Sequence, residues 1–475
     1  MNIIRKDPTS FLFYDYETFG TNPALDKPCQ FAYIRTDFSL NNLYESEIFY
    51  CYPPMDYFPD PKSLLITGIT PKETYLKGMN EFIFSKKIFD IFSQPNSCIV
   101  GFNNIAFDDE ITRNIFYRNL IDPYEWSWKN GNSRWDIINV IRACFALRPE
   151  GINWPKNSTG LNSFKLSDLT YVNGIQHEHA HQALSDVMAT FKLMQLIKNK
   201  KKRLFSFLFK NRFKENLKRI VNVKESRPII YISSFFGTKN NNLGIIVPIF
   251  WDSNNSNSFI AVNIINDINK LVDFVKKKDI KANDLKYLFQ NGLQIINVNK
   301  CPILIPINVL SLKDISRLKI NLDICFKNLK ILKNNDYVKS KIKFFFSKLR
   351  FSSFRDVDLQ IYDSFFNKND KNLIKSYRKN FFNVSNVSLN NFNDSRIKEI
   401  IFRCKARNFP HILNADEKNK WKLHCFQFFK EKKTKLYIEK INSLLELEKN
   451  NQKNVYILKN LLKHVFNLLK FFKFM

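Results

Sequence analysis

Alternation of apolar and polar residues near the N-terminus predicts a set of short β-strands. In FLFYDYET, residues 11–18, every second side chain points to the same side of a strand, which groups Phe11, Phe13, Asp15 and Glu17. Three later apolar runs are also predicted as strands: residues 31–36, 48–52 and 98–100. One face of the first strand therefore presents two aromatic rings followed by two carboxylates.

Helical spacing appears between and after these strands. Thr70, Pro71 and Glu73 suit the N-cap, N1 and N3 positions of a helix that begins with a capping box. A second helix is predicted over residues 81–93, and a third follows Asp108. Strands followed by alternating strand and helix are typical of an α/β domain, so we predict an α/β fold with a mixed sheet.

The middle of the chain changes its pattern after the basic run at residues 199–203. A short helical stretch is expected over residues 204–220. Three strands, expected at residues 229–232, 244–251 and 258–264, indicate a small β barrel or sheet. Helices return beyond residue 320, where one face is predicted to carry Leu322, Cys325, Phe326, Leu329 and Leu332.

The chain is predicted to be helical from about residue 356 to its end. Val455, Leu458, Leu462, Val465 and Leu469 form an amphipathic stripe with lysines on the other face. A helix lying on a membrane surface is one interpretation, but we favour a helix docked in a helical domain. At 475 residues the chain needs more than one core, and we place three domains at residues 1–200, 201–355 and 356–475.

Charge is distributed unevenly between the parts of the chain. Residues 1–190 carry 17 Lys and Arg against 22 Asp and Glu, a net charge of −5, whereas the rest carries 57 against 22, a net charge of +35. An AT-rich genome would also enrich lysine, but uniform drift would not leave the first part acidic. The asymmetry indicates a basic surface that contacts phosphate groups.

The cysteines and the N-terminus indicate a cytoplasmic protein. The eight cysteines are scattered singly, without a C-x-x-C pair, which argues against a zinc site or a disulfide framework and favours a reducing compartment. The N-terminal MNIIRKDPTS lacks the apolar segment of a signal peptide, and no run is long and apolar enough to span a membrane. We expect a monomer with no membrane partner.

Asp15 and Glu17 are the first candidates for chemistry. Carboxylates at the end of an apolar strand are costly unless they are paired, and a divalent cation such as Mg²⁺ is the simplest partner. A strand with a solvated acidic face is the alternative, and it suits this pair taken alone. Three later residues change the balance: Asp108, His181 and Asp186. His181 and Asp186 are five residues apart and cannot share a helix face, so His181 is assigned to a loop or first turn.

The order Asp-x-Glu, Asn-x-x-x-Asp, His-x-x-x-x-Asp resembles the DEDDh family of 3′→5′ exonucleases. The resemblance implies that Asp15, Glu17, Asp108 and Asp186 are catalytic carboxylates serving two Mg²⁺ ions. It further implies that Asp15, Glu17 and Asp186 are the metal ligands and that His181 accepts a proton from the attacking water. His177 and His179 are nearby alternatives, but the spacing to Asp186 selects His181.

Longer stretches narrow the resemblance to the branch of this family that degrades single-stranded DNA. They lie at residues 26–28, 65–71, 112–119, 147–155, 299–302, 328–332 and 406–410. The resemblance implies a ribonuclease-H-like exonuclease domain, an SH3-like domain and an α-helical C-terminal domain, with a role in DNA repair and recombination. It also implies a partner, the single-strand DNA-binding protein, held through its acidic C-terminal tail, for which Arg148 is one candidate contact.

Aromatic residues alternate with arginines over residues 122–154, a composition suited to stacking single-stranded nucleic acid. Trp126 and Trp135, taken singly, are better explained as core residues. By resemblance, the substrate-binding residues are Glu17, Arg113, Tyr124, Trp128, Arg142 and Lys165. Lys165 stands where the family is expected to have arginine. Lysine keeps the positive charge at this position but lacks the planar guanidinium.

Two other functions compete with this prediction. A DEDDh exoribonuclease would use the same carboxylates, but such chains are shorter and lack a basic second half of this size. A non-catalytic protein that binds single strands would be expected to have lost a carboxylate, and all four are present. The sequence therefore predicts an exodeoxyribonuclease that releases 5′-mononucleotides from the 3′ end of single-stranded DNA.

Overall fold

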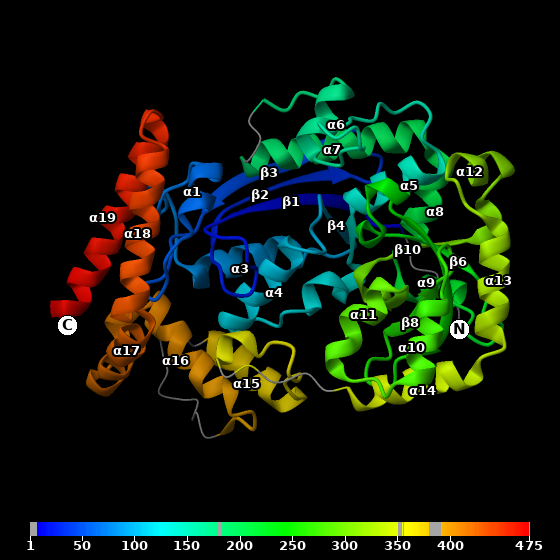
Figure 1. Ribbon diagram of the computed structural model, residues 1–475. Helices are drawn as coiled ribbons and strands as arrows, with labels where there is room; N and C mark the ends of the chain where they lie inside the picture. The colour runs from blue at the N-terminus through cyan, green and yellow to red at the C-terminus, as the bar shows by residue number, and fades with distance from the viewer. Residues whose placement is uncertain (1–6, 179–181, 350–353, 355, 380–390, 475) are drawn as a thin grey trace. The chain divides into compact units, whose positions relative to one another are not determined.

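The computed structural model describes residues 7–178, 182–349, 354, 356–379 and 391–474 (Figure 1). Contacts within the chain divide it into two compact units. Unit 1 comprises Met1–Asn132, Glu178–Met188 and Ser353–Met475, and unit 2 comprises Ser133–His177 and Ala189–Ser352. Unit 1 therefore contains both the beginning and the end of the chain.

Unit 1 is built around strand β1 (Ser10–Thr18). This strand pairs antiparallel with β2 (Pro28–Asp37) and parallel with β4 (Ser97–Gly101), and β3 (Leu43–Tyr50) extends the sheet beyond β2. The strand order β3-β2-β1-β4 confirms the predicted mixed sheet (Figure 1). The interior position of β1 follows from its composition, since its apolar side chains on both faces are at most 4% exposed.

Four helices accompany this sheet: α1 (Pro61–Thr67), α2 (Pro71–Lys77), α3 (Glu81–Phe92) and α4 (Asp108–Arg118). The predicted cap of α2 is present, because Thr70 Oγ1 accepts a hydrogen bond from the backbone N–H of Glu73 at 3.2 Å. Helices α3 and α4 cover the face of β1 that carries Tyr14 and Tyr16. Their apolar residues form one core with these rings, which fixes α4 against the central strand.

The C-terminal part of unit 1 consists of helices α15 to α19. Their bounds are Lys368–Lys379, Arg396–Asn408, Ala415–Phe428, Glu431–Leu447 and Gln452–Phe474. The described helical pattern starts later than predicted, because residues 356–367 hold only a 3-10 turn, Val357–Leu359, and irregular backbone. Helices α18 and α19 lie side by side (Figure 1).

Helix α19 is docked, as predicted, but it packs on the sheet domain as well as on the helical part where it was expected. Leu458 and Val465 are fully buried in one cluster with Phe19, which follows β1, and Leu64 of α1. Among the described residues no helix is long and apolar enough to cross a membrane. The apolar face of α19 is therefore used for packing inside unit 1.

A buried network of ion pairs joins the first and last parts of unit 1. The Arg407 guanidinium on α16 donates to Asp56 Oδ2 and to Asp358 Oδ2, each at 2.7 Å, and His424 Nε2 of α17 lies 3.0 Å from Asp56. Burial raises the pKa of the Asp56 carboxyl, but Arg407 and the hydrogen bonds outweigh burial and hold that pKa well below its ordinary value. Asp56 is therefore ionised in the interior of unit 1.

Unit 2 contains an antiparallel sheet in the order β10-β6-β7-β8-β9. Its strands β6 to β10 are Ile229–Ile232, Leu243–Trp251, Ser258–Asn263, Leu293–Asn297 and Ile303–Pro306. The three strands predicted in this region are confirmed within one residue at each end. Strand β5 (Ser133–Asp136) opens the unit.

Unit 2 also contains helices. They are α5 (Ile137–Leu147), α6 (Leu166–Val172), α8 (Lys202–Lys210), α9 (Lys214–Ile220), α10 (Asn269–Lys277), α11 (Leu285–Gln290), α12 (Leu312–Arg317), α13 (Leu322–Lys333) and α14 (Asp336–Lys348). Helix α7 (Ala183–Lys200) begins in unit 1 and continues in unit 2. Trp135 packs edge-on against Phe205 of α8, so its prediction as a core residue is confirmed.

The predicted face of α13 is wrong at one position. Phe326 is 65% exposed, whereas Cys325, Asn328 and Leu332 are buried. Asn328 takes an interior place because its side-chain amide donates to the backbone carbonyls of Ile264 at 3.0 Å and Asn266 at 2.8 Å. Cys325 and Leu332 of the predicted face remain buried, so the buried amide joins that face while Phe326 is left out of it.

The buried network predicts that Arg407→Met destabilises the protein strongly. The variant leaves the Asp56 and Asp358 carboxylates buried without their shared cation, which should cost about 3–5 kcal/mol of unfolding free energy. Urea denaturation at neutral pH measures this. Lys440→Met is the matched control, because it removes an exposed pair with Asp60 at 2.5 Å and should cost less than about 1 kcal/mol. Equal losses in the two variants would contradict a structural role for the network.

Candidate catalytic site

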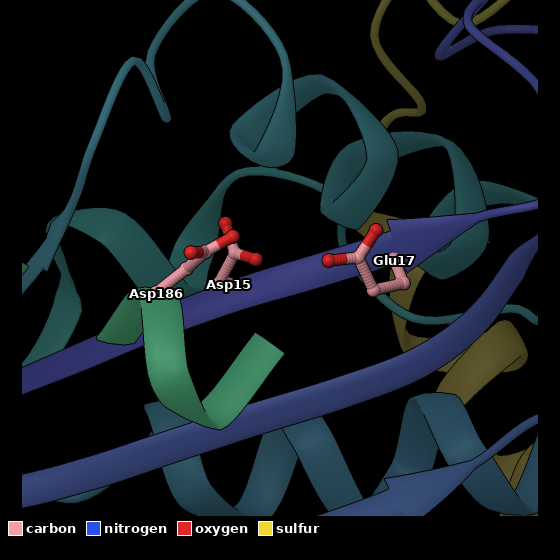
Figure 2. A group of neighbouring side chains, drawn as sticks. All are labelled: Asp15, Glu17 and Asp186. Carbon is pink, nitrogen blue, oxygen red and sulfur yellow. The ribbon is translucent and has the colours of Figure 1, made fainter. Parts of the chain in front are cut away.

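Three carboxylates converge at the centre of unit 1. Asp15 and Glu17 project from the same face of β1, and Asp186 lies in the first turn of α7. One carboxylate oxygen from each residue lies within 4.8 Å of the other two. Figure 2 shows the Asp15 and Asp186 carboxylates close together and Glu17 further along the strand. The structure thus brings together the three residues predicted as metal ligands.

Burial and mutual repulsion make this cluster unfavourable for three negative charges. Burial, followed by the neighbouring Asp108, Glu17 and Asp186, raises the pKa of Asp15 well above its ordinary value. Burial, followed by Asp186 and Asp108, raises the pKa of Glu17 to about 9. A divalent cation would reverse both effects, and carboxylate oxygens are the ligands that hard cations prefer. The residues present therefore fit a divalent metal site.

Asp108 supplies the fourth carboxylate from the first turn of α4. Its Oδ1 accepts a hydrogen bond from the backbone N–H of Tyr16 at 3.3 Å, so it lies beside β1 between the two acidic residues of that strand. Asp108 is 4% exposed, and its charge acts on both Asp15 and Glu17. It is a neighbour of the cluster rather than one of the three residues with converging oxygens.

His181, the predicted base, lies outside the described residues, as does His179. The backbone of Ala183, two residues beyond His181, donates to Gln30 Oε1 of β2 at 3.2 Å. His177, the other alternative, has its Nδ1 3.2 Å from the hydroxyl of Thr170 at the end of α6. His177 therefore contacts a side chain of unit 2.

Arg113 and Tyr124, predicted to bind substrate, lie together in unit 1. The Arg113 guanidinium is 5.6 Å from the centre of the Tyr124 ring and donates to Glu110 Oε1 at 2.9 Å. Tyr362, from the irregular segment before α15, stands beside them and accepts from Arg113 at 3.3 Å. Arg113 is buried, so the two tyrosine rings are the parts of this group on which a base would stack.

The remaining predicted substrate residues are placed separately. Trp128 is 57% exposed in unit 1, while Trp126 is buried, so only the first of these rings is accessible. Arg142 of α5 and Lys165, which precedes α6, belong to unit 2. Lys165 is exposed, and Arg142 donates to Asn139 Oδ1 at 3.0 Å. Trp128 and Lys165 are thus both open to solvent.

Sequence reasoning missed the segment around Tyr362. Tyr362 hydrogen-bonds Glu110 of α4, and Phe365 packs edge-on against Tyr124 with ring centres 5.3 Å apart. Both rings are more than half exposed. The sequence holds a signal here, since IYDSFF sets three aromatic residues among polar ones, but the prediction of a helical domain from residue 356 obscures it.

Family models match three consecutive parts of the chain. The model described as Exonuclease matches residues 12–194, the Exonuclease I SH3-like domain matches 212–348, and the Exonuclease I C-terminal domain matches 355–468. Curated relatives extend over almost the whole length. The exodeoxyribonuclease I of Buchnera aphidicola subsp. Schizaphis graminum is 49% identical over 99% of this chain and 98% of its own. The exodeoxyribonuclease I of Escherichia coli is 42% identical over 96% of this chain and 97% of its own.

Solved structures of exonuclease I share the fold. Escherichia coli exonuclease I in complex with a dA16 oligonucleotide has a TM-score of 0.91 and 40% identity, covering 97% of this chain and 100% of the other. A zinc-bound complex of the same enzyme with single-stranded DNA has a TM-score of 0.90 and 40% identity, covering 97% of this chain and 100% of the other. A crystal structure of SSB/exonuclease I in complex with an inhibitor has a TM-score of 0.89 and 40% identity, covering 97% of this chain and 100% of the other.

The carboxylate cluster predicts that Glu17→Gln stabilises the metal-free protein at high pH. The pKa of Glu17 rises from 4.5 to about 9 in the folded chain, so folding favours the protonated carboxyl. That contribution is complete below pH 4.5 and is lost as the pH rises towards 9. With chelator present, the variant should unfold at a higher temperature than the wild type at pH 8, and by a smaller margin at pH 5.

Thermal unfolding followed by circular dichroism measures this difference. Glu439→Gln, on the exposed side of α18, is the control and should follow the wild type at both pH values. Added Mg²⁺ should raise the unfolding temperature of the wild type more than that of Glu17→Gln. A variant that is less stable than the wild type at pH 8 would argue against the electrostatic origin of the effect.

Proposed function

Because the chain belongs to the exodeoxyribonuclease I family, we propose that its carboxylate cluster cleaves the terminal phosphodiester of single-stranded DNA with two Mg²⁺ ions. The chain is a nuclease that degrades single-stranded DNA from the 3′ end and depends on a divalent metal. The release of 5′-mononucleotides is part of the proposal. The observation that carries it is the convergence of Asp15, Glu17 and Asp186 oxygens within 4.8 Å.

The four carboxylates divide between the two proposed ions. Asp15, Glu17 and Asp186 would hold one, and Asp15 with Asp108 would serve the other. When bound, divalent ions supply charge stabilisation at the attacking and leaving oxygens of the phosphate. The chain contributes by holding these carboxylates on β1, α4 and α7, so that little rearrangement is needed when the ions and the strand arrive.

His181 is the proposed general base. It precedes α7 by two residues, and α7 carries Asp186, so the histidine and the ligand are close in sequence. Its ordinary pKa near neutrality allows the ring to accept a proton from the attacking water. His177, whose ring lies beside Thr170, is the less suitable alternative.

The strand would be held by stacking and by charge. Arg113, Tyr124 and Trp128 offer a cation and rings in unit 1, and Arg142 and Lys165 offer cations in unit 2. Glu17 would face the terminal nucleotide from the metal site. The excess of +35 beyond residue 190 supports non-specific contact with phosphates. We keep three domains, with boundaries near residues 200 and 355, as the proposed organisation.

The chain binds single-stranded DNA and the single-strand DNA-binding protein. We infer that it holds the acidic C-terminal tail of that protein. Arg148 supports this, since its side chain is 41% exposed and its Nη1 lies 3.2 Å from Asp314 Oδ2. Arg317 Nη2 lies 3.2 Å from the other oxygen of the same carboxylate, Oδ1. Two arginines around one carboxylate offer a basic site for an acidic peptide.

The cellular setting is proposed from the same family membership. We propose a monomer that acts in DNA repair and recombination in the cytoplasm. All eight cysteines are free and buried, which suits a reducing compartment. An exoribonuclease and a silent single-strand-binding protein are both less well supported, because the named relatives are exodeoxyribonucleases and the full carboxylate set is retained.

Digestion of end-labelled substrates tests the proposed function. Wild-type protein with Mg²⁺ should shorten single-stranded DNA from the 3′ end and leave duplex DNA and RNA largely intact. Chelator should stop the reaction. Asp186→Asn should abolish cleavage while keeping strand binding, because it removes a ligand and no substrate contact. Degradation of RNA at the same rate would instead support the exoribonuclease, and activity near wild type in Asp186→Asn would exclude the metal assignment.

Replacement of the histidines tests the proposed base. His181→Ala should lower turnover by on the order of 10²–10⁴, the usual range for a lost general base. His177→Ala is the matched control and should stay within a few-fold of wild type. Single-turnover cleavage of a short oligonucleotide separates chemistry from product release. A larger loss in His177→Ala than in His181→Ala would transfer the role to His177.

A further inference from the structure

A fully buried carboxylate next to the catalytic cluster has no part in the mechanism above. Asp109 follows Asp108 in the first turn of α4 and is 0% exposed. Its Oδ1 accepts a hydrogen bond from the Tyr14 hydroxyl at 2.6 Å and another from the Asn104 side-chain amide at 3.1 Å. Burying a carboxyl is unfavourable without hydrogen-bond donors, so a buried carboxyl that is supplied with two donors suggests a specific role.

Tyr14 connects this carboxylate to the central strand. It lies on β1 directly before Asp15, and because successive side chains alternate, its ring points to the opposite face. The ring is 1% exposed and packs edge-on against Phe92 of α3, with centres 5.0 Å apart. Burial, followed by the charges of Asp109 and Asp108, raises the pKa of Tyr14 well above its ordinary value, so the hydroxyl remains a donor at neutral pH.

The loop before α4 is shaped to bring Asn104 into the same contact. The backbone N–H of Asp109 donates to the carbonyl of Asn104 at 2.8 Å. Asn103 adopts a positive φ of 64°, which is uncommon for a residue with a side chain. A Cβ at Gly101 would lie 2.6 Å from the Cβ of Asn104, so glycine is needed for this close approach. The turn between β4 and α4 is therefore built around Asn104 and Asp109.

We propose that Tyr14 and Asp109 are positioning residues that hold Asp108 at the metal site. The Tyr14–Asp109 bond ties the first turn of α4 to β1, one residue away from Asp108 on the helix and from Asp15 on the strand. Asp108 also accepts a hydrogen bond from the backbone N–H of Tyr16 at 3.3 Å, so Asp108 and Asp109 are both joined to β1. The inference rests on the proposed function, because it gives Asp108 its role at the metal site.

Tyr14→Phe removes one hydroxyl from a ring that already packs among phenylalanines. Loss of a hydrogen bond that orients a metal-binding group commonly costs about 10–100-fold in affinity or activity. We therefore expect Tyr14→Phe to weaken Mn²⁺ binding at least about tenfold, measured by electron paramagnetic resonance without DNA. It should also lower kcat while the KM for a short oligonucleotide stays unchanged, since no strand contact is altered.

Tyr16→Phe is the matched control. The Tyr16 hydroxyl lies 3.0 Å from Thr112 Oγ1, so it joins the same strand to the same helix one turn further along, without touching Asp109. Both variants should lower the urea midpoint to a similar extent, whereas only Tyr14→Phe should change Mn²⁺ affinity. Equal Mn²⁺ affinity in the two variants would overturn the inference, because both bonds would then be merely structural.

A double variant tests whether Tyr14 acts through Asp109. Asp109→Ala should weaken Mn²⁺ binding, and Tyr14→Phe in that background should weaken it no further. Additive losses would show that Tyr14 acts independently and would overturn the proposal. Failure of the proposed function has a different signature, since the wild type would then neither bind Mn²⁺ at the cluster nor cut DNA.

Discussion

Close approach of carboxylates in a poorly hydrated interior is the constraint on which this structure depends. Asp15, Glu17 and Asp186 converge within 4.8 Å, and burial raises the pKa of the first two. Without restraint, these carboxylates would take up protons or move away from one another. They are held because Asp15 and Glu17 pair with β2, while the preceding part of β1, Ser10–Phe13, pairs with both β2 and β4. Phe11 and Phe13 are fully buried on the same face as the two carboxylates. The stability of the sheet therefore offsets the electrostatic cost of bringing these carboxylates together.

A second set of buried charges in unit 1 is satisfied in the opposite way. Asp56 and Asp358 share the guanidinium of Arg407, and their pKa values fall although both groups are buried. Here the chain supplies its own cation, whereas the catalytic cluster is left for a cation from solution. The Arg407 network fixes α16 and α17 to the sheet domain. The catalytic cluster consists of three carboxylates, which suits a cation from solution.

This network also changes how the domains are understood. The sequence suggests a catalytic part and a separate helical part, because composition and periodicity change between them. In the structure, α19 covers Phe19, two residues beyond Glu17, and Arg407 binds Asp56. The first and last parts therefore share one core. No local pattern reveals this, since the contacts join residues more than 350 positions apart.

The sequence by itself determined the positions of β1, β2, β4, β6, β7 and β8, the start of α2 and the identity of the carboxylates, because alternation, capping and motif order are local properties. It placed β3 at residues 48–52 rather than Leu43–Tyr50, and it did not reveal β5, β9 or β10. Trp126 and Trp135 were correctly expected in the core. Only the tertiary structure decided which apolar residue is displaced, as Asn328 shows by taking an interior place that Phe326 was expected to share. It also decided that Tyr362 stands beside Arg113 and that Tyr14 meets Asp109. These outcomes depend on hydrogen-bond partners distant in sequence, and a buried polar group goes where its partners are.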